Sequence, residues 1–408
     1  MTTWILEPRD TLLVRDARPS TAAGALRSLD FPWPSSLAGL LRTRIGTNGT
    51  GYFDPQFAEP AKQITVRGPL LAELNPTGEM GDFFAPAPSD CVWYRELAEA
   101  DGSAVKSIRR RLEPVNYRED RECEGFQTDL DTKVYGREQT KYLLRHGSVS
   151  STTKPVPGCA FWRWADLQLW LEAPASEQVF PEHTGTCNVK QPCFQHFGLP
   201  ALVREQRTHV SIDAGNQTAA DGMLFTTESL RFTKTKQGSA PKEFGLLFTC
   251  DNPYQEKHPL NEGIVTFGGE HKLSFLSKSK QTLPAIPPRL VDALEKSRQG
   301  GPFLARVVLL TPALFEDGFA PKWIGDKTAK VVAAAVQRPQ IVSGWDFATQ
   351  KPKANRRMAP AGSVYWVELP DGLNVAKWLD LVWMKCLTNQ LTEQDPRDGF
   401  GLCAVGVG

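Results

Sequence analysis

The hydrophobic positions of this chain fall into many short runs that prolines and glycines separate. Short runs rich in β-branched and aromatic residues predict strands, and the clearest are Trp4–Leu6, Ile64–Leu71, Glu243–Cys250, Phe303–Leu310, Ser363–Leu369 and Leu402–Val407. Apolar residues at helical spacing predict helices over Phe161–Leu171, Pro287–Ser297 and Leu373–Leu387. The aromatic stripe of the helix predicted over Phe161–Leu171 is expected in the core or at a subunit interface.

Twice along the chain, these elements follow the order strand, helix, strand, strand, helix, strand, with additions. That order is the plan of ferredoxin-like folds, which RNA-recognition modules share. The pattern therefore predicts an α+β protein of two ferredoxin-like (RRM-like) domains with inserted loops, a hairpin and helical segments. Asn252-Pro253 and the polar loop that follows indicate the boundary, which gives domains at residues 1–255 and 256–408.

Two stretches of the first domain depart from this plan. An insertion is expected at about 100–200, and within it residues 100–146 carry dense charges of both signs, so we interpret that stretch as exposed, a solvated face without a ligand. Residues 203–235 contain two β-type runs around the polar sequence AGNQTAAD, which is typical of a long hairpin. The hairpin either contacts RNA or a neighbouring subunit, or is a plain hairpin.

The stretch from Trp4 to Gly46 offers the first candidate site. Two short strands, Trp4–Leu6 and Thr11–Val14, are predicted on either side of a break, and Arg15 and Arg18 follow. Ser35 or Ser36 is expected to cap a helix that carries Arg42 and ends at Gly46. Because a helix N-terminus leaves backbone N–H groups free, a phosphate suits this end. The alternative is an ordinary capped helix with solvated arginines, or an Arg15 that pairs with Asp10 or Asp16.

Three further motifs are candidates for contact with RNA. Gly268-Gly269, followed by Glu270, His271 and Lys272, allows backbone to approach a phosphate or another segment closely. The loop KPKANRRM carries Lys351, Lys353, Arg356 and Arg357 without an acidic residue, so it is either a phosphate clamp or a solvated surface. Gly399 and Gly401 flank Phe400 in a sequence that suits a tight turn, with or without RNA beside it.

The sequence offers little that points to metal binding or catalysis. His183, Cys187, Cys193 and His196 are good zinc ligands, but their spacing lacks the usual C-x2-C pair, so we expect no structural metal and no cofactor. The GxSxG, HExxH and P-loop signatures are absent, as is a GGDD-type polymerase signature.

Composition narrows the class of protein. Lys and Arg total 47 against 46 Asp and Glu, so any contact with nucleic acid must use a local basic patch and the help of partners. No apolar run is long enough to cross a bilayer, and the first residues do not have the pattern of a signal peptide. We therefore expect a cytoplasmic protein without membrane contact, and its eight cysteines are expected to be free thiols.

The opening residues EPRDTLLVRDARP and FPWPSSLAGLLRT resemble the amino terminus of the RAMP superfamily of CRISPR proteins. Within it, the chain is most similar to the family of subunit three of the type III-B (Cmr) effector complex. Further blocks recur in the same order: Pro86–Asp90, Gly268–Glu270, Leu309–Phe315, Gly344–Asp346, Pro360–Tyr365 and Asp398–Gly401. Residues from about 100 to 157 and from 175 to 200 contribute nothing to the resemblance.

The resemblance implies a non-catalytic RNA-binding subunit of an RNA-guided antiviral ribonucleoprotein. Such a subunit holds the 5′ tag of the guide RNA (crRNA), docks on the large polymerase-like subunit and on backbone RAMP subunits, and meets target RNA indirectly. One alternative is an RNA-processing RAMP endoribonuclease with a histidine near its first helix, although no histidine precedes His146. The other alternative is a protein-only adaptor.

Overall fold

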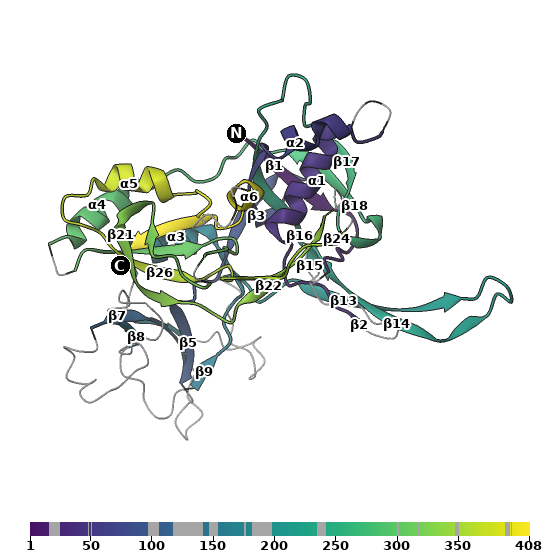
Figure 1. Ribbon diagram of the computed structural model, residues 1–408. Helices are drawn as coiled ribbons and strands as arrows, with labels where there is room; N and C mark the ends of the chain where they lie inside the picture. Colours follow the sequence, from purple (N-terminus) through teal and green to yellow (C-terminus); the bar gives the residue numbers. More distant parts are fainter. Residues whose placement is uncertain are drawn as a thin grey trace.

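The computed structural model describes residues 1–15, 25–47, 49, 51–96, 106–116, 142–146, 154–174, 177–181, 198–234, 242–299, 302–316, 318–346, 351–387, 392 and 394–408 (Figure 1). Two large sheets form two neighbouring lobes, and the long β13/β14 hairpin projects from one of them. The protein is a sheet-rich α+β protein, as the sequence predicts.

The first sheet has nine strands in the order β12-β10-β4-β3-β16-β1-β18-β17, and β15 pairs with β16. In chain order the strands are β1 (Thr2–Pro8), β3 (Thr65–Leu74), β4 (Met80–Pro86), β10 (Phe161–Arg163), β12 (Gly198–Leu199), β15 (Thr233–Lys234), β16 (Lys242–Asp251), β17 (Gly263–Thr266) and β18 (Leu273–Lys278). All the neighbours in this sheet are antiparallel. Since β17 and β18 follow the predicted boundary at residue 255 but complete this sheet, the chain passes to the second sheet only after Lys278.

The second sheet has five antiparallel strands in the order β20-β21-β26-β19-β27. Its strands are β19 (Leu304–Leu309), β20 (Trp323–Ile324), β21 (Asp326–Ala335), β26 (Val364–Glu368) and β27 (Cys403–Val407). Every residue of β19, an interior strand between β26 and β27, is buried.

Helices cover the sheets and also join them. They are α1 (Pro34–Gly46), α2 (Ala58–Ala61), α3 (Trp164–Glu172), α4 (Pro288–Ser297), α5 (Val375–Val382) and α6 (Gln394–Asp398). Leu37, Leu41 and Ile45 of α1 pack in one core on the first sheet. A larger core combines Ile5 and Leu247 of the first sheet with buried residues of β19 and β26 of the second. The two lobes therefore share a hydrophobic interior.

The aromatic stripe predicted near residue 161 is confirmed as core. Trp164, Leu167, Trp170 and Leu171 are the buried face of α3. The predicted helix starts three residues too early, however, because Phe161–Arg163 pairs with β4 as β10. Leu171 lies against Gly406 of β27, so α3 contributes to the wall between the lobes.

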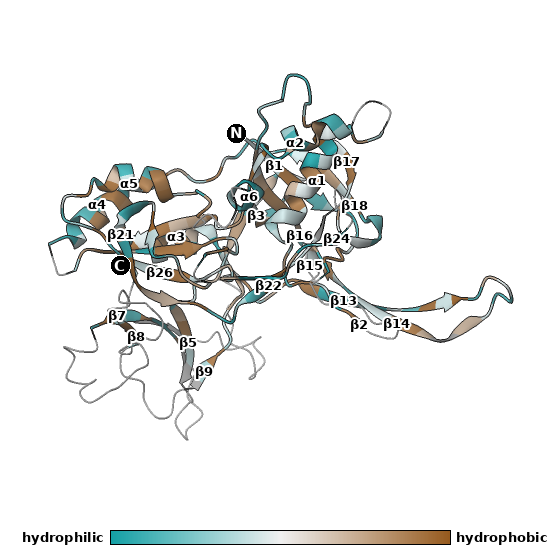
Figure 2. Cartoon of the chain, viewed as in Figure 1, coloured by the Kyte–Doolittle hydropathy of each residue, from teal (hydrophilic) through white to brown (hydrophobic). Residues whose placement is uncertain are grey.

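The predicted hairpin is also confirmed. Strands β13 (Val203–Ile212) and β14 (Ala219–Arg231) pair along their length, and β2 (Ala25–Leu26) adds a parallel pair at the base. Figure 2 shows the hairpin as mostly polar and pale along its length. Val210, Ile212 and Leu224 nevertheless expose 45%, 59% and 63% of their surface near the tip.

Smaller sheets make up the rest of the described chain. Four strands pair in the order β11-β6-β5-β9: β5 (Cys91–Glu96), β6 (Lys106–Arg111), β9 (Lys154–Val156) and β11 (Glu177–Pro181). Three two-stranded sheets join β7 (Glu113–Val115) to β8 (Leu143–Arg145), β22 (Gln340–Val342) to β25 (Arg356–Met358), and β23 (Trp345–Asp346) to β24 (Lys351–Pro352). Among the described helices, none has the length and apolar character of a membrane span.

Candidate nucleic-acid interface

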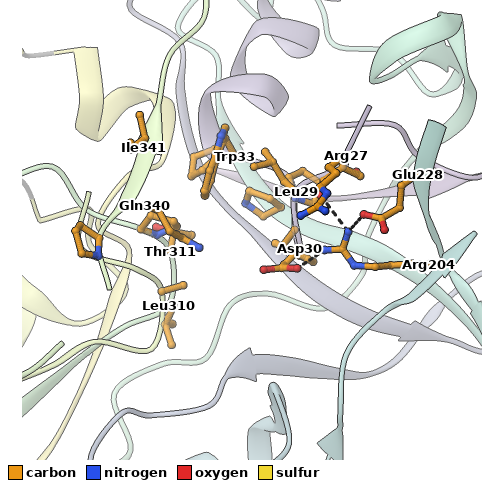
Figure 3. Close-up of a pocket in the computed structure, with 18 of the residues that line it drawn as sticks. Arg27, Leu29, Asp30, Trp33, Arg204, Glu228, Leu310, Thr311, Gln340 and Ile341 are labelled. Atoms are coloured by element: carbon orange, nitrogen blue, oxygen red, sulfur yellow. Dashed lines mark hydrogen bonds and ion pairs between the residues drawn. The ribbon is translucent and has the colours of Figure 1, made fainter. Parts of the chain in front are cut away.

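A cleft of about 850 Å³ lies between the two lobes beside the start of α1. Figure 3 shows Gln340, Thr311 and Leu310 on one wall, opposite Trp33, Asp30 and Arg204 on the other. The remaining lining residues come from the segment before α1 and its first residue, β3, the hairpin, and β22 and loops of the second lobe: Arg27, Ser28, Leu29, Phe31, Pro32, Pro34, Pro69, Gln206, Thr226, Glu228, Pro312, Pro339, Ile341, Asn355 and Ala361. Blocks that are far apart in the sequence therefore meet here.

The charges that line the cleft balance one another. Arg204 donates to Glu228 and to Asp30, and also to the Ser28 carbonyl at 3.1 Å. Arg27 is exposed and makes no hydrogen bond or ion pair with the described residues. Two arginines thus face two carboxylates, and the rest of the described lining consists of amides, hydroxyls, prolines and apolar groups. This interior suits a neutral, partly apolar group better than a phosphate.

The start of α1 differs from the prediction. The helix begins at Pro34, Trp33 is the N-cap residue, and no side chain caps the end. Neither Ser35 nor Ser36 is the cap, so that prediction is wrong. The physical reason is that proline at the first helical position has its φ preset and has no N–H to satisfy. Both serines lie in the first turn, where the Ser36 amide donates to the Trp33 carbonyl at 3.1 Å.

The segment that precedes α1 is tied to the opening of the chain. Thr11–Val14 is not a strand: Leu12 forms a single bridge to Leu230, and Arg15 forms one to Ser28. The Asp10 carboxylate accepts from the Thr11 amide at 2.7 Å, which turns the backbone out of strand geometry. Arg15 is exposed and lies next to the residues that begin the cleft wall.

The glycine pair at 268–269 packs against this opening segment. Gly268 has φ +81°, and a Cβ there would lie 2.8 Å from the Leu13 carbonyl oxygen. The Gly269 amide donates to that same oxygen at 2.7 Å. His271 ends a short 3₁₀ turn (Gly269–His271), and Lys272 pairs with Asp10 at 3.2 Å. The close backbone approach at this pair is therefore made to a segment of the same chain.

Two predicted RNA ligands are held by carboxylates of α6. Arg42 donates to Asp398 at 2.5 Å and to the carbonyls of Ala61 and Ile64 at 3.0 and 2.9 Å. Arg356 contacts both oxygens of Asp395, at 2.9 and 2.8 Å, and the side chain of Asp395 is only 3% exposed. In this structure both arginines therefore make contacts within the protein, one in each lobe.

The glycine turn that follows α6 packs behind the cleft. Gly399 has φ +102°, and a Cβ there would lie 2.7 Å from the Gly68 carbonyl oxygen and 3.3 Å from Pro34. The Thr311 hydroxyl, on the cleft wall, donates to the Gly399 carbonyl at 2.7 Å. Gly401 has φ +78° and lies against the backbone of Leu387. The turn thus contacts residues of both cleft walls, Pro34 on one and Thr311 on the other.

Three of the predicted cations are exposed and make no ion pair with the described residues. They are Lys351, Lys353 and Arg357. Asn355, between them in the sequence, lines the cleft, and Arg357 is the register partner of the lining residue Ile341. The basic loop therefore borders the cleft on the side of the second lobe.

Sequence reasoning missed a buried charged cluster under the second sheet. Arg306 donates to Asp90, both side chains are fully buried, and Asp90 also accepts from the Trp170 indole at 3.0 Å. Burial lowers the pKa of Arg306, although the nearby Asp90 opposes this shift. The Arg109 guanidinium lies over Trp162 and Trp170 at 5.0 and 4.8 Å. Arg109 was expected on a solvated face; it is buried because these tryptophans come from distant segments that no local pattern reveals.

The other predicted residues either lie outside the described part or are inert. Arg18 and the four candidate zinc ligands, His183, Cys187, Cys193 and His196, lie outside the described residues. Within the described residues, no cluster of His, Cys, Asp or Glu could hold a metal ion. The five described cysteines are free, and burial raises the pKa of Cys250 and of Cys386 to about 12, which makes both thiols poor nucleophiles.

Comparisons with known proteins match this chain over nearly its whole length. It is similar to a chain of a cryo-EM structure described as the type III-B Cmr-β bound to cognate target RNA and AMPPnP, with 17% identity, coverage of 89% of this chain and 86% of the other, and a TM-score of 0.43. The Cmr-β structure bound to cognate target RNA alone gives 16% identity, the same coverage and the same TM-score. A crystal structure of the Csm3–Csm4 subcomplex of the type III-A CRISPR-Cas interference complex gives 10% identity, coverage of 91% and 93%, and a TM-score of 0.32.

Among curated proteins, none matches the chain. The profile of one protein family, described as CRISPR-associated protein (Cas_Cmr3), matches residues 4–408. The chain therefore belongs to the Cas_Cmr3 family of CRISPR-associated proteins.

Proposed function

We propose that this chain is a non-catalytic, RNA-binding subunit of a type III-B CRISPR interference complex and holds the 5′ tag of the guide RNA. Membership of the Cas_Cmr3 family supports the kind of complex. The observation that carries the RNA-binding part is the cleft between the lobes, because the start of α1, the glycine turn after α6 and the basic loop all border it.

The charges around the cleft suggest how RNA is held. Inside, Arg204 is neutralised by Asp30 and Glu228, so the interior accepts an unstacked base. Arg27, an exposed residue of the lining, and Lys353 and Arg357, which are exposed beside the cleft, are available to phosphates. Single-stranded RNA is recognised in this way, through splayed bases in pockets and cations along the backbone.

We further propose that both lobes are variants of the ferredoxin-like unit, each with one of its two helices. The strand orders β18-β1-β16-β3 and β27-β19-β26-β21 support this, with α1 in the first lobe and α5 in the second. RNA-recognition modules of this plan stack bases on an open sheet face. Here the shared core and α3 cover the faces where the lobes meet, which favours binding by loops.

The partners proposed are the large polymerase-like subunit and the backbone RAMP subunits, with target RNA met only indirectly. The exposed aliphatic residues near the hairpin tip support a contact at that point. An endoribonuclease is the second candidate from the sequence, and a metal-free cleavage assay on repeat RNA separates it from the function proposed here. A protein-only adaptor is the third candidate, and crosslinking separates that one.

Crosslinking within the assembled complex tests the proposal directly. Guide RNA with a photoreactive nucleotide at each tag position in turn is expected to crosslink to peptides that contain Arg27–Pro34 or Gln340–Arg357. Lys353→Ala with Arg357→Ala should weaken guide retention and flatten its salt dependence by about 0.7 units of slope per lost phosphate contact. The matched control is Lys62→Ala with Lys280→Ala, two exposed cations that pair with Glu59 and Glu79. A complex that assembles without any crosslink between the tag and this subunit would contradict the proposal.

A further inference from the structure

The amide group of Gln340 has unused hydrogen-bonding capacity at the wall of the cleft. Its Oε1 atom is buried and accepts no hydrogen bond, and the side chain makes none with the described residues. The residue begins β22 and faces Trp33 across the cleft in Figure 3. A buried carbonyl oxygen without a donor costs free energy, so the site is more stable when an occupant supplies one.

Two polar groups near this oxygen are already engaged by other residues. The Thr311 hydroxyl donates to the Gly399 carbonyl and accepts from the Leu402 amide at 2.8 Å. Arg204, on the opposite wall, is engaged by Asp30 and Glu228. Asn355 lines the same cleft and also makes no hydrogen bond with the described residues. The side-chain amides of Gln340 and Asn355 are therefore available to an occupant of the cleft. The cleft lining has equal numbers of positive and negative side chains.

We infer that Gln340 is a specificity-determining residue that reads an exocyclic amino group of a base in the guide tag. The inference rests on the proposed function, in which the cleft holds that tag. A glutamine amide offers an acceptor beside a donor, which complements an amino group beside an unprotonated ring nitrogen. Adenine and cytosine carry that pattern. The amino group donates to the buried Oε1, and the ring nitrogen accepts from Nε2.

Guide RNAs that lack single amino groups test the inference in the assembled complex. Each tag adenine is replaced in turn by purine riboside and each tag cytosine by pyrimidin-2-one riboside, so that only the amino group is lost. With the wild-type subunit, one such replacement is expected to weaken guide retention about tenfold, the size of a good amide–base pair. With Gln340→Leu, retention is already weaker, and the same replacement costs nothing more.

Two controls keep the test specific. Gln337→Leu changes an exposed glutamine three residues away that does not line the cleft, and it should retain the amino-group dependence of the wild type. Gln340→Glu keeps the oxygen acceptor but loses the Nε2 donor, so it should keep the dependence on the amino group while overall retention of the guide weakens. A 2′-deoxy nucleotide at the sensitive position distinguishes a ribose donor from the base.

The failures of the inference and of the proposed function are distinguishable. If the wild-type complex retains and crosslinks the guide, but no amino-group replacement matters, the inference is overturned and RNA binding stands. The inference is also overturned if the 2′-deoxy nucleotide, and not the loss of the amino group, weakens guide retention. It is overturned as well if removal of the amino group weakens retention equally in the wild type and in Gln340→Leu. If the tag neither crosslinks nor depends on this subunit, the proposed function falls first. Should Gln340→Leu fail to fold, Gln340→Met removes the amide while it keeps the length of the side chain, and the loss of the amino-group dependence in that variant decides in its place.

Discussion

Asp10 is the residue at which three segments of the first lobe meet. Its carboxylate accepts from the Thr11 amide, pairs with Lys272 after the glycine pair, and lies 3.9 Å from Arg207 of the hairpin. The Thr11 amide and these cations hold the pKa of Asp10 below its ordinary value. One exposed carboxylate thus links the chain opening, the glycine turn and the hairpin base.

The stability that Asp10 contributes should depend on pH. Since its folded pKa is lowered, the contribution is present above the unfolded pKa near 4 and is lost as pH falls through the lower, folded value. Asp10→Asn should therefore lower the melting temperature at pH 7, and the difference from wild type should shrink below about pH 4. Melting temperatures of both proteins between pH 7 and pH 3 check this. A difference that stays constant over that range would show that the carboxylate charge has no such role.

The arginines that the sequence predicts as RNA ligands differ in whether a carboxylate from a distant segment pairs with them. Arg356 and Arg357 are adjacent in the sequence, yet within the described part of the chain only Arg356 forms an ion pair, because Asp395 approaches it from α6. Arg42 is likewise paired by Asp398, 356 residues away. The basic loop and the helix could be predicted from local sequence, but the carboxylates that engage some of their arginines come from long-range packing. The local sequence pattern therefore predicted more arginines without a carboxylate partner than the structure has.

At the scale of elements, α6 and the turn after it join the two lobes. Asp398 of α6 pairs with α1, Asp395 pairs with β25, and Gly399 then packs on the Gly68 carbonyl. This element was predicted only as a glycine turn, because a helix of five residues has no useful periodicity. The longer helices and most strands were predictable, since burial on one face leaves a repeating apolar pattern.

Gly399 should tolerate no side chain. Gly399→Ala places a methyl group 2.7 Å from the Gly68 carbonyl oxygen at φ +102°, and we expect it to lower the free energy of unfolding by about 1–3 kcal/mol. Gly39→Ala is the matched control: this glycine is exposed within α1 with nothing near its Cβ position, and the change should add about 0.5–1 kcal/mol. Urea unfolding of the two variants measures both values. Equal effects from both substitutions would contradict this account of the turn.

Arg42 should contribute mainly to the stability of the fold and not to RNA binding. Its side chain is 15% exposed and donates to Asp398 and to the Ala61 and Ile64 carbonyls. Arg42→Ala removes all three of these hydrogen bonds and leaves Asp398 without its cation, with Gln394 as a remaining donor at 2.9 Å. We expect a loss of about 2–4 kcal/mol in the free energy of unfolding. Arg44→Ala, an exposed arginine on the same helix, should change it by less than about 0.5 kcal/mol. If Arg42→Ala unfolds like wild type but loses guide RNA, Arg42 is a ligand instead.

At the scale of the whole molecule, the two lobes share one hydrophobic interior. The larger core includes Ile5 and Leu247 from the first sheet and Val307 and Trp366 from the second. The buried Asp90–Arg306 pair adds a contact between the loop after β4 and the interior strand β19. The sequence predicted two sheet-bearing units, but α3, whose stripe was expected in a core, packs on both lobes. That pairing depends on contacts such as Gly406 against Leu171, which only the tertiary structure defines.

A shared interior predicts that the lobes unfold together. Calorimetry of the full chain should show a single transition, because exposing one sheet uncovers apolar surface of the other. Asp90→Ala leaves the Arg306 charge buried without its partner and should lower stability by about 3–5 kcal/mol. The variant should still melt in one transition, shifted as a whole to lower temperature. Two independent units would instead give two transitions, of which the substitution moves only one. In that case the lobes would be separate domains, and the cleft between them would be free to change its width without unfolding either one.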